Sequence, residues 1–484
     1  MFEIKGKYGK ALITIDVLED SALKQIYNMV NHPAFTEHVA IMADAHAGSG
    51  CVVGFTMPLT DKIVPSVVGV DLSCGVLCVN IGQNVPMKLD RLNNLIKKNI
   101  PMGSKTHENA VVDFKKEYKW NDANDMFKKF IVKYNEKFNT NYEPILFDYD
   151  YFLNLLNRVD SNVNAIKSIG TLGGGNHFIS IEVSEKNGDA WILIHSGSRN
   201  LGKRVCEYHQ NIAKKSLDDK RNVELKSKID FIINNTIDKH KIPILINDAK
   251  KDIGIFLSDV NINGMEYLGG QNAINYFMDM IFMNFYSDLN RWTMMNIILD
   301  ILKIEEIKDT IHSVHNYIDF KDMIIRKGAI SAHENEKIIL PMNMRDGSLI
   351  CVGKSNSDFN FSAPHGAGRV MSRGEAKRKV DLDKFKESMK GIYSTSVNED
   401  TLDESPFAYK KSEMIESAIG DTVILIDRIK PILNIKSSEK EGIREMKKKE
   451  KDKKRQIGKD EDDMIYNKDF RKDRKKLRSI RGKY

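Results

Sequence analysis

Five histidines stand in short segments rich in glycine and other small residues, a setting that suits ligand binding. They are His46 in ADAHAG, His177 in GGGNHF, His195 in IHSGSR, His315 in SVHNY and His365 in SAPHGAG. Glycine lets the backbone approach a ligand closely, and strand ends display side chains on a rigid scaffold. A single histidine of this kind is as often an ordinary core residue. Five in matching settings indicate a shared site.

An acid and a thiol occur in the segment PSVVGVDLSCGVLCV, residues 65–79, whose small and branched apolar residues predict a buried strand. Asp71 and Cys74 alone have an ordinary explanation, because free cysteine is often buried and aspartate is common in turns. Together with the histidines, they form a mixed set of thiol, imidazole and carboxylate groups. Such a set suits zinc, manganese, iron or cobalt, whereas calcium or magnesium alone would not require the thiolate.

These candidate ligands are dispersed along the chain, unlike the closely spaced cysteine pairs of a compact structural zinc module. Ligands gathered from distant segments more often build a cleft. Two ions about 4 Å apart that share one ligand would suit phosphoryl chemistry, and a bridging thiolate is a plausible task for Cys74.

The segments that carry the candidate ligands alternate with helical ones. Short β-type runs with many glycines occupy roughly residues 10–85, 168–205 and 310–375, and amphipathic helical runs fill residues 86–165 and 207–310. The Met- and Phe-rich run NAINYFMDMIFMNFYSDLNRW is predicted to pack as core. A charged helical segment follows residue 375, and the strand-like run DTVILIDRIKPILNIK is predicted to end the folded body.

Composition narrows the class of protein. The 484 residues are 41% hydrophobic, which is enough for a sizeable core in one large domain or in two to three smaller ones. No window approaches the roughly 18 apolar residues that a membrane span requires, and the first residues lack an apolar export signal. The five cysteines are sparse and odd in number, which argues against a disulfide framework. We therefore expect a cytoplasmic protein without a membrane segment.

The net charge of +7 comes from the C-terminal tail. Residues 437–484 hold 19 Lys/Arg and 11 Asp/Glu, against 55 and 56 in residues 1–436. The tail has few apolar residues, so we expect a solvated extension that is flexible or partly helical. Its basic runs would attract a phosphate backbone without reading sequence, and a purely solubilising role is equally consistent. A specific nucleic-acid site must lie in the near-neutral body.

Several of these motifs resemble, in the same order, the successive signatures of the RtcB-type RNA ligases. They are GVDLSCG, GTLGGGNHF, IHSGSRNLG, HNY, RKGAIS, SAPHGAGR and IKPILNIK, and the resemblance runs from about residue 40 to 436. It implies a mixed α/β fold: a single large domain over residues 1–436, with central β-sheets and helical insertions at about 86–165 and 207–310, followed by the basic tail.

The resemblance also implies an activity. Members of this family join RNA 3′-phosphate or 2′,3′-cyclic phosphate ends to 5′-hydroxyl ends, in tRNA splicing or RNA repair. They use GTP, two Mn²⁺ ions and a covalent guanylate on a histidine. The implied partner is RNA with these ends, and an activating protein is a further candidate partner.

Matched motif by motif, the resemblance assigns roles to individual residues. The nucleophile corresponds to His365. One metal position is implied for Asp71, Cys74 and His177, and the other for Cys74, His195 and His315. The residues matched to nucleotide contacts are Asn176 and Lys436. Arg369 is a candidate phosphate clamp, because a guanidinium matches phosphate oxygens, and Tyr409 is a candidate stacking partner for the base. Looser candidates near phosphate or RNA are Arg199, His46 and Asp44.

The nucleotide pocket departs from the family pattern at two positions. Ser180 stands where the family usually has a glutamate that contacts guanine, and Asn343 stands where a base-contacting serine is usual. Glu182, two residues on and on the same face of the strand, either compensates or has no part. We expect the metal centre and nucleophile to be intact, and the departures suggest a branch with altered nucleotide or RNA-end preference.

Two other classes stay open. A metal-dependent RNA phosphoesterase or end-processing enzyme would use the same two-metal floor with water as nucleophile, and it would not need His365. A non-catalytic RNA-binding protein would depend on the basic tail and show no turnover. A structural zinc protein is least favoured, because a closed site would not need the histidine of SAPHGAGR.

Overall fold

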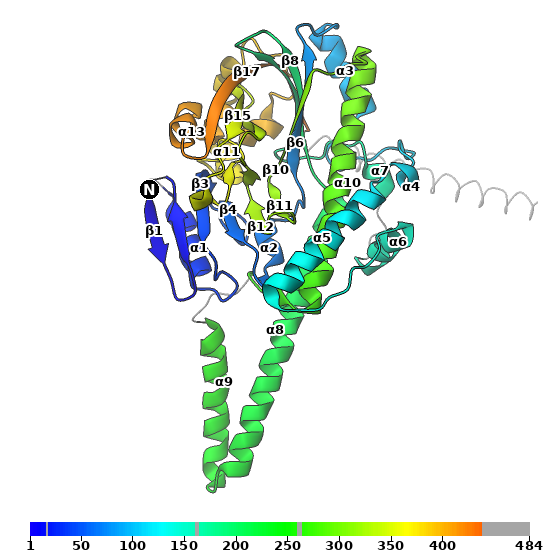
Figure 1. Ribbon diagram of the computed structural model, residues 1–484. Helices are drawn as coiled ribbons and strands as arrows, with labels where there is room; N and C mark the ends of the chain where they lie inside the picture. The colour runs from blue at the N-terminus through cyan, green and yellow to red at the C-terminus, as the bar shows by residue number, and fades with distance from the viewer. Residues whose placement is uncertain (16–17, 160–163, 259–263, 438–484) are drawn as a thin grey trace, which may run out of the picture. The chain divides into compact units, whose positions relative to one another are not determined.

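Two large sheets form the centre of the protein (Figure 1). The first contains, in spatial order, β1 (Phe2–Lys5), β2 (Lys10–Ile13), β3 (Val39–His46), β4 (Val53–Pro58), β12 (Ile324–Lys327) and β11 (Asn316–Asp319). The second contains β10 (Asp309–Val314), β6 (Gly75–Gly82), β8 (Ala190–Ser196), β7 (Phe178–Ser184), β17 (Val423–Lys436), β15 (Gly347–Gly353) and β14 (Lys337–Asn343). Two short pairs join β5 (Lys62–Ile63) to β9 (Leu268–Gly269), and β13 (Ala329–Ser331) to β16 (Ser362–Pro364). The pair of β2 and β3 is parallel, while the strands of the second large sheet pair antiparallel.

This computed structural model describes residues 1–15, 18–159, 164–258 and 264–437. Residues 1–437 form one compact unit. The predicted mixed α/β class, with central sheets and helical insertions, is confirmed. The prediction of a flexible or partly helical tail falls on residues 438–484, which lie outside the described residues.

Helices occupy most of the chain between the strands. The longer ones are α1 (Asp20–Val30), α3 (Leu89–Asn99), α5 (Trp120–Phe138), α6 (Tyr149–Arg158), α8 (Arg199–Asn235), α9 (Ile242–Ser258) and α10 (Gln271–Leu302). Shorter ones are α2 (Pro65–Val68), α4 (Phe114–Glu117), α7 (Ala165–Ser168), α11 (Arg373–Lys379), α12 (Leu382–Ser388) and α13 (Ser412–Ala418), with 3₁₀ turns η1 (Lys239–Lys241), η2 (Ser357–Phe359), η3 (Glu399–Glu404) and η4 (Pro406–Ala408). Within the described part of the chain, no helix combines the length and apolar character needed to cross a bilayer.

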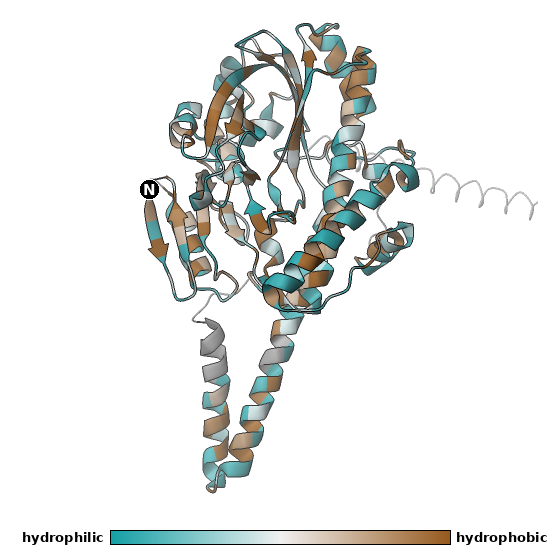
Figure 2. Ribbon diagram, viewed as in Figure 1, coloured by the Kyte–Doolittle hydropathy of each residue, from teal (hydrophilic) through white to brown (hydrophobic). Residues whose placement is uncertain are grey.

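The predicted packing of the Met- and Phe-rich run is confirmed in α10, which is apolar along much of its length (Figure 2). Phe277, Phe282 and Met294 are fully buried. Phe282 stacks on Tyr118 with ring centroids 4.8 Å apart, which joins α10 to the segment between α4 and α5. The aromatic residues of this run therefore belong to the core.

The central strands of the second sheet are buried on both faces. Leu77 and Val79 pack in a cluster with Met294 and other residues of α10, whereas Val76 and Cys78 pack in a separate cluster. Because successive side chains of a strand point to opposite faces, one face of the sheet lies against α10. The other face packs against residues of the same sheet, including Ile339 of β14 and Ile350 of β15. All seven residues of β8 are buried in this arrangement.

The expected strand over residues 65–79 is wrong in its first half. Residues 65–68 form the short helix α2, and the strand β6 begins only at Gly75. Pro65 suits the first position of a helix because that position has no intrahelical use for an N–H. Ser73 has a φ of +58°, which breaks the extended backbone before β6. Asp71 and Cys74 consequently lie in the turn between helix and strand.

A buried carboxylate links three of the helices. Asp279 on α10 accepts hydrogen bonds from Arg158 on α6 at 2.7 Å and from His209 on α8 at 2.7 Å. Burial alone would raise the pKa of Asp279, but His209 and Arg158 bring that pKa below its ordinary value. The interaction therefore favours the ionised carboxylate in the folded state.

We expect Asp279→Ala to lower the free energy of unfolding by roughly 3 kcal/mol, because it leaves a buried charge without its partner. Chemical denaturation at neutral pH measures this change. Asp300→Ala, at an exposed position of the same helix, should change the free energy by less than about 0.5 kcal/mol. Equal effects of the two substitutions would contradict the role of Asp279.

Candidate metal centre and nucleotide cavity

The predicted metal ligands meet at one edge of the second sheet. Cys74 precedes β6, His177 precedes β7, His195 lies near the end of β8 and His315 follows β10. Because these strands are antiparallel, the start of β6 or β7 lies beside the end of β8 or β10. The register pairs Gly75 with Ser196 and with Val314, and Phe178 with His195.

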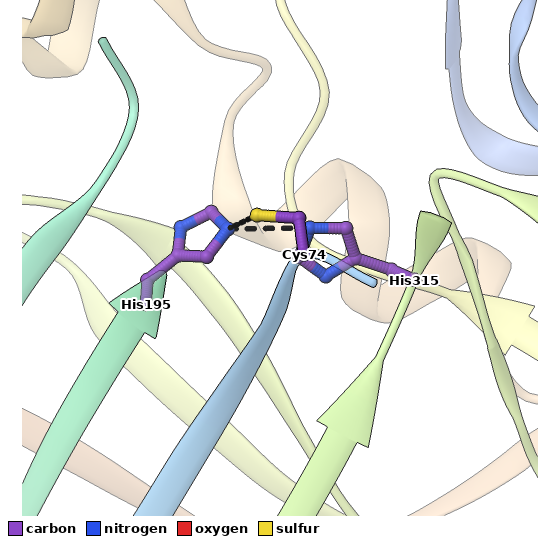
Figure 3. Close-up of side chains that lie close together, drawn as sticks. All are labelled: Cys74, His195 and His315. Atoms are coloured by element: carbon purple, nitrogen blue, oxygen red, sulfur yellow. Dashed lines mark hydrogen bonds between the residues drawn. The ribbon is translucent and has the colours of Figure 1, made fainter. Parts of the chain in front are cut away.

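Cys74 lies at the centre of this cluster, as Figure 3 shows for Cys74, His195 and His315. Its Sγ is 3.2 Å from His195 Nε2 and 3.4 Å from His177 Nε2. His195 Nε2 is 3.2 Å from His315 Nε2, and His177 Nε2 is 2.7 Å from Asp71 Oδ2. Two groups of donor atoms result, Cys74 with His195 and His315, and Asp71 with Cys74 and His177, each within 4.8 Å. Cys74 belongs to both groups.

Hydrogen bonds orient two of these side chains. His177 Nδ1–H donates to the carbonyl of Leu172 at 2.8 Å, so Nε2 is the nitrogen that faces the cluster. Asp71 Oδ1 accepts from the backbone N–H of Ser198 at 3.1 Å, which leaves Oδ2 for His177. Such outer contacts usually accompany metal ligands, because they fix ring orientation and raise ligand basicity.

Helix α10 holds the loops that carry the ligands. Arg291 is fully buried and donates to the carbonyls of Ser73 at 2.8 Å and Ser196 at 2.9 Å. Asn290 donates to the carbonyl of Gly197 at 3.0 Å and accepts from the N–H of Thr171 at 3.1 Å. Ser73, Ser196 and Gly197 lie within two residues of Cys74 or His195, and Thr171 lies six residues before His177. Helix α10 therefore positions the loops that carry the candidate metal ligands.

The donor set fits divalent transition ions. Burial and the neighbouring histidines lower the pKa of His195 and His315 well below the usual value, so both rings are neutral at physiological pH, the form that binds metals. Burial and the Asp71 carboxylate raise the pKa of the Cys74 thiol well above its usual value. A cation would offset that cost, since a coordinating thiol loses its proton on binding.

We expect Cys74→Ala to weaken Mn²⁺ binding at least tenfold, because both donor groups lose their shared atom. Equilibrium dialysis with metal analysis measures the affinity and the number of bound ions. Cys351→Ala removes a buried thiol in a different cluster and should bind Mn²⁺ as the wild type does. Unchanged binding in Cys74→Ala would show that this cluster is not the metal site.

His365 follows β16 and is fixed by Asp44 of β3. Its Nδ1–H donates to Asp44 Oδ2 at 2.6 Å, and its backbone N–H donates to the same oxygen at 3.1 Å. The ring of His365 lies 4.8 Å from that of His315, centroid to centroid, next to the metal cluster. Because Asp44 holds the Nδ1 proton, Nε2 carries the free lone pair and can act as a nucleophile.

Close backbone packing keeps Asp44 in place. Gly368 has a φ of +69°, and a Cβ at that position would lie 2.1 Å from the Asp44 carbonyl oxygen. Only glycine therefore fits beside Asp44. Lys410 Nζ donates to the carbonyls of Ala43 and Ala45, the two residues that flank Asp44. His46 Nδ1–H donates to the Asp44 carbonyl at 3.0 Å, so His46 supports the same strand end.

A cavity of about 360 Å³ opens beside His365. Ten of the residues singled out in the sequence line it, namely His46, Asp71, Asn176, His195, His315, Asn343, His365, Arg369, Tyr409 and Lys436. Cys74 and His177 lie in the adjoining metal cluster, and Asp44 lies behind His365. The fold therefore gathers most of the predicted site residues into one place.

Glu404 organises the cationic wall of the cavity, although no local motif indicated it. It accepts hydrogen bonds from Lys436 Nζ at 2.6 Å, Arg373 at 2.7 Å and the Tyr409 hydroxyl at 2.8 Å, with Arg369 at 3.5 Å. Burial raises the pKa of Glu404, but Lys436, Arg373 and Arg369 together lower that pKa to about 2. Glu404 thus holds three cationic side chains close together, and the group of four charged side chains keeps a net positive charge.

Three predicted residues take unexpected positions. Ser180 is absent from the cavity lining, and its hydroxyl donates instead to Glu182 Oε1 at 2.7 Å. Asn343 reaches the wall, but its Nδ2 donates to Asp346 at 2.7 Å within the β14–β15 turn. Arg199 is also absent from the lining, since it donates to Thr171 and to the Gly103 carbonyl. Arg373 and Lys327 line the cavity without having been singled out. Arg373 lies outside the recognised motifs, and Lys327 lies in RKGAIS, to which no residue role was assigned.

Two groups of candidate metal ligands that share Cys74 lie beside an oriented histidine, in a cavity lined by cations, and this arrangement suits phosphoryl transfer. The profile of the family described as tRNA-splicing ligase RtcB matches residues 25–437, and the chain belongs to this family. It is 27% identical over 449 residues to the RNA-splicing ligase RtcB of Escherichia coli K12, covering 87% of this chain and 95% of that protein. The tRNA-splicing ligases RtcB of Aeropyrum pernix and Archaeoglobus fulgidus are 23% and 24% identical, covering 88% and 86% of this chain and 93% and 91% of theirs. The predicted family and the predicted enzyme class, an RNA ligase, are confirmed.

Proposed function

We propose that this protein joins RNA 3′-phosphate or 2′,3′-cyclic phosphate ends to 5′-hydroxyl ends, in tRNA splicing or RNA repair, with GTP and two Mn²⁺ ions. The observation that carries this proposal is the placement of His365. Its Nδ1 proton is held by Asp44 at 2.6 Å, and its ring lies 4.8 Å from that of the metal-cluster residue His315. Family membership supports the same activity.

In the first step, His365 Nε2 attacks the α-phosphorus of GTP. A nitrogen–phosphorus bond forms, the bond to the bridging oxygen breaks, and pyrophosphate leaves with the electron pair. The ring gains positive charge while Nδ1 keeps its proton, and the Asp44 carboxylate stabilises that charge as the aspartate of a catalytic triad does. The product is a guanylate on His365.

In the following steps, an RNA 3′-phosphate oxygen attacks this phosphorus and releases His365, giving an activated RNA end. The 5′-hydroxyl oxygen of the second end then attacks the activated 3′-phosphate, loses its proton and expels GMP. A 2′,3′-cyclic end must first be opened to the 3′-phosphate by water. Bound Mn²⁺ would supply Lewis-acid stabilisation of the phosphoryl oxygens throughout.

The cationic wall supports phosphate binding. Arg369, Arg373 and Lys436 lie around two buried carboxylates, Glu404 and Asp403, so three cations face two anions and positive charge remains in excess there. Arginine forks match phosphate oxygens, and Lys436 adds a compact positive charge. We further propose a cytoplasmic location, because all five cysteines are free thiols, as expected in a reducing compartment.

We expect His365→Ala to abolish covalent labelling of the protein by α-³²P-GTP in Mn²⁺, because the nucleophile is removed. Gel autoradiography measures the label. His333→Ala is the matched control, because His333 also pairs with an aspartate, Asp322 at 2.6 Å, yet does not line the cavity. Labelling that survives in His365→Ala would contradict the proposal, and RNA hydrolysis without any labelling would favour the metal-dependent phosphoesterase.

We expect Asp44→Asn to slow the labelling of His365 by at least about 100-fold, because the amide cannot stabilise the charged ring and permits the wrong tautomer. Single-turnover labelling rates measure this effect. GTP and Mn²⁺ affinity should change little, since Asp44 lies behind His365 and outside both donor groups. A rate within threefold of the wild type would exclude a catalytic role for the pair.

A further inference from the structure

Three buried polar side chains line the cavity on neighbouring strands of the second sheet. Glu182 is on β7, Asn434 on β17 and Ser348 on β15, and these strands are adjacent in that order. Their exposed fractions are 2%, 4% and 1%. The reactions proposed above use none of them, so their presence in a cavity wall requires another explanation.

Each of these three side chains has an oxygen atom without a hydrogen-bond partner in the described part of the chain: Glu182 Oε2, Asn434 Oδ1 and Ser348 Oγ. Among the described residues, none donates to Glu182 Oε2 or to Asn434 Oδ1. Leaving one buried polar atom unsatisfied costs about 1–3 kcal/mol, which a ligand in the cavity would recover. The other carboxylate oxygen, Glu182 Oε1, is held by the Ser180 hydroxyl at 2.7 Å. The carboxylate is therefore fixed in orientation, with Oε2 free and a second lone pair left on Oε1.

The free acceptors select a class of ligand. A carboxylate pairs best with two adjacent N–H donors, and among the nucleobases guanine presents them as its ring N–H and exocyclic amine. Adenine instead presents one amine beside a ring nitrogen that is itself an acceptor. Burial raises the pKa of Glu182 to about 7, against the effect of the Ser180 and Ser348 hydroxyls, so guanine N–H groups would stabilise the ionised form.

Neither of the two family-pattern departures offers a free group for this task. The Ser180 hydroxyl is engaged with Glu182. The Asn343 side chain donates to Asp346 and accepts from the backbone N–H groups of Arg345 at 3.0 Å and Asp346 at 2.9 Å. Among the described residues of this wall, the unpartnered oxygen atoms are Glu182 Oε2, Asn434 Oδ1 and Ser348 Oγ.

We propose that Glu182 determines the nucleobase specificity of this enzyme by accepting hydrogen bonds from the guanine edge, with Asn434 beside it. The proposal rests on the proposed function, in which a guanine nucleotide occupies the cavity with its phosphate at His365. Glu182 would thus be a specificity residue of the nucleotide site, displaced by two positions along β7 from Ser180.

The test is equilibrium binding of GMP, IMP and AMP to the full-length protein by isothermal titration calorimetry, because monophosphates cannot react with His365. IMP lacks only the exocyclic amine of GMP. We expect the wild type to bind GMP at least tenfold more tightly than IMP or AMP. Glu182→Gln should bind GMP at least tenfold more weakly and prefer it over IMP by less than threefold. Glu185→Gln, at an exposed position just beyond β7, should behave as the wild type.

The outcomes separate this inference from the proposed function. Retention of the GMP preference in Glu182→Gln would overturn the role of Glu182 while GTP labelling of His365 continued to support the ligase. Equal affinity of the wild type for all three nucleotides would also overturn the role of Glu182. This comparison needs no variant, so the proposal can be tested even if Glu182→Gln misfolds. Absence of both binding and labelling would overturn the proposed function as well.

Discussion

The antiparallel register of the second sheet is the constraint on which the site depends. Gly75 pairs with both Ser196 and Val314, so the strand starts and ends that carry Cys74, His195 and His315 meet at one edge. A shift by one residue in the pairing of β8 would turn His195, the candidate ligand that lies within a strand, to the opposite face. The nucleophile and the cavity depend on the same edge, because His365 packs against His315 and the cavity opens beside His365.

Buried charge is tolerated around this edge because each charged group has partners. Arg291 is fully buried yet binds the carbonyls of both ligand loops, and Glu404 is buried among Lys436, Arg369 and Arg373. Helix α10 is therefore both core and positioning element: its apolar residues cover the sheet while Arg291 holds the loops. The free acceptor of Glu182 is an exception that a ligand would satisfy.

Short motifs were the predictable part of this protein. The residues of SAPHGAGR and GNHF could be recognised because glycine-rich turns and reactive side chains are close in sequence. Residues 65–79 could not be assigned correctly, since an apolar run of this length does not distinguish a strand from a short helix followed by a turn. Glu404 and Arg373 were missed because the fold alone brings them to Lys436.

The central claim is that Cys74 is shared by two metal ions at this sheet edge. Electron paramagnetic resonance during titration of the full-length protein with Mn²⁺ tests it most directly. The structure predicts that a second equivalent produces a spin-coupled signal, and that Cys74→Ala loses this signal, because the two donor groups have Cys74 in common. Two equivalents that bind with additive, uncoupled six-line spectra would contradict a shared ligand.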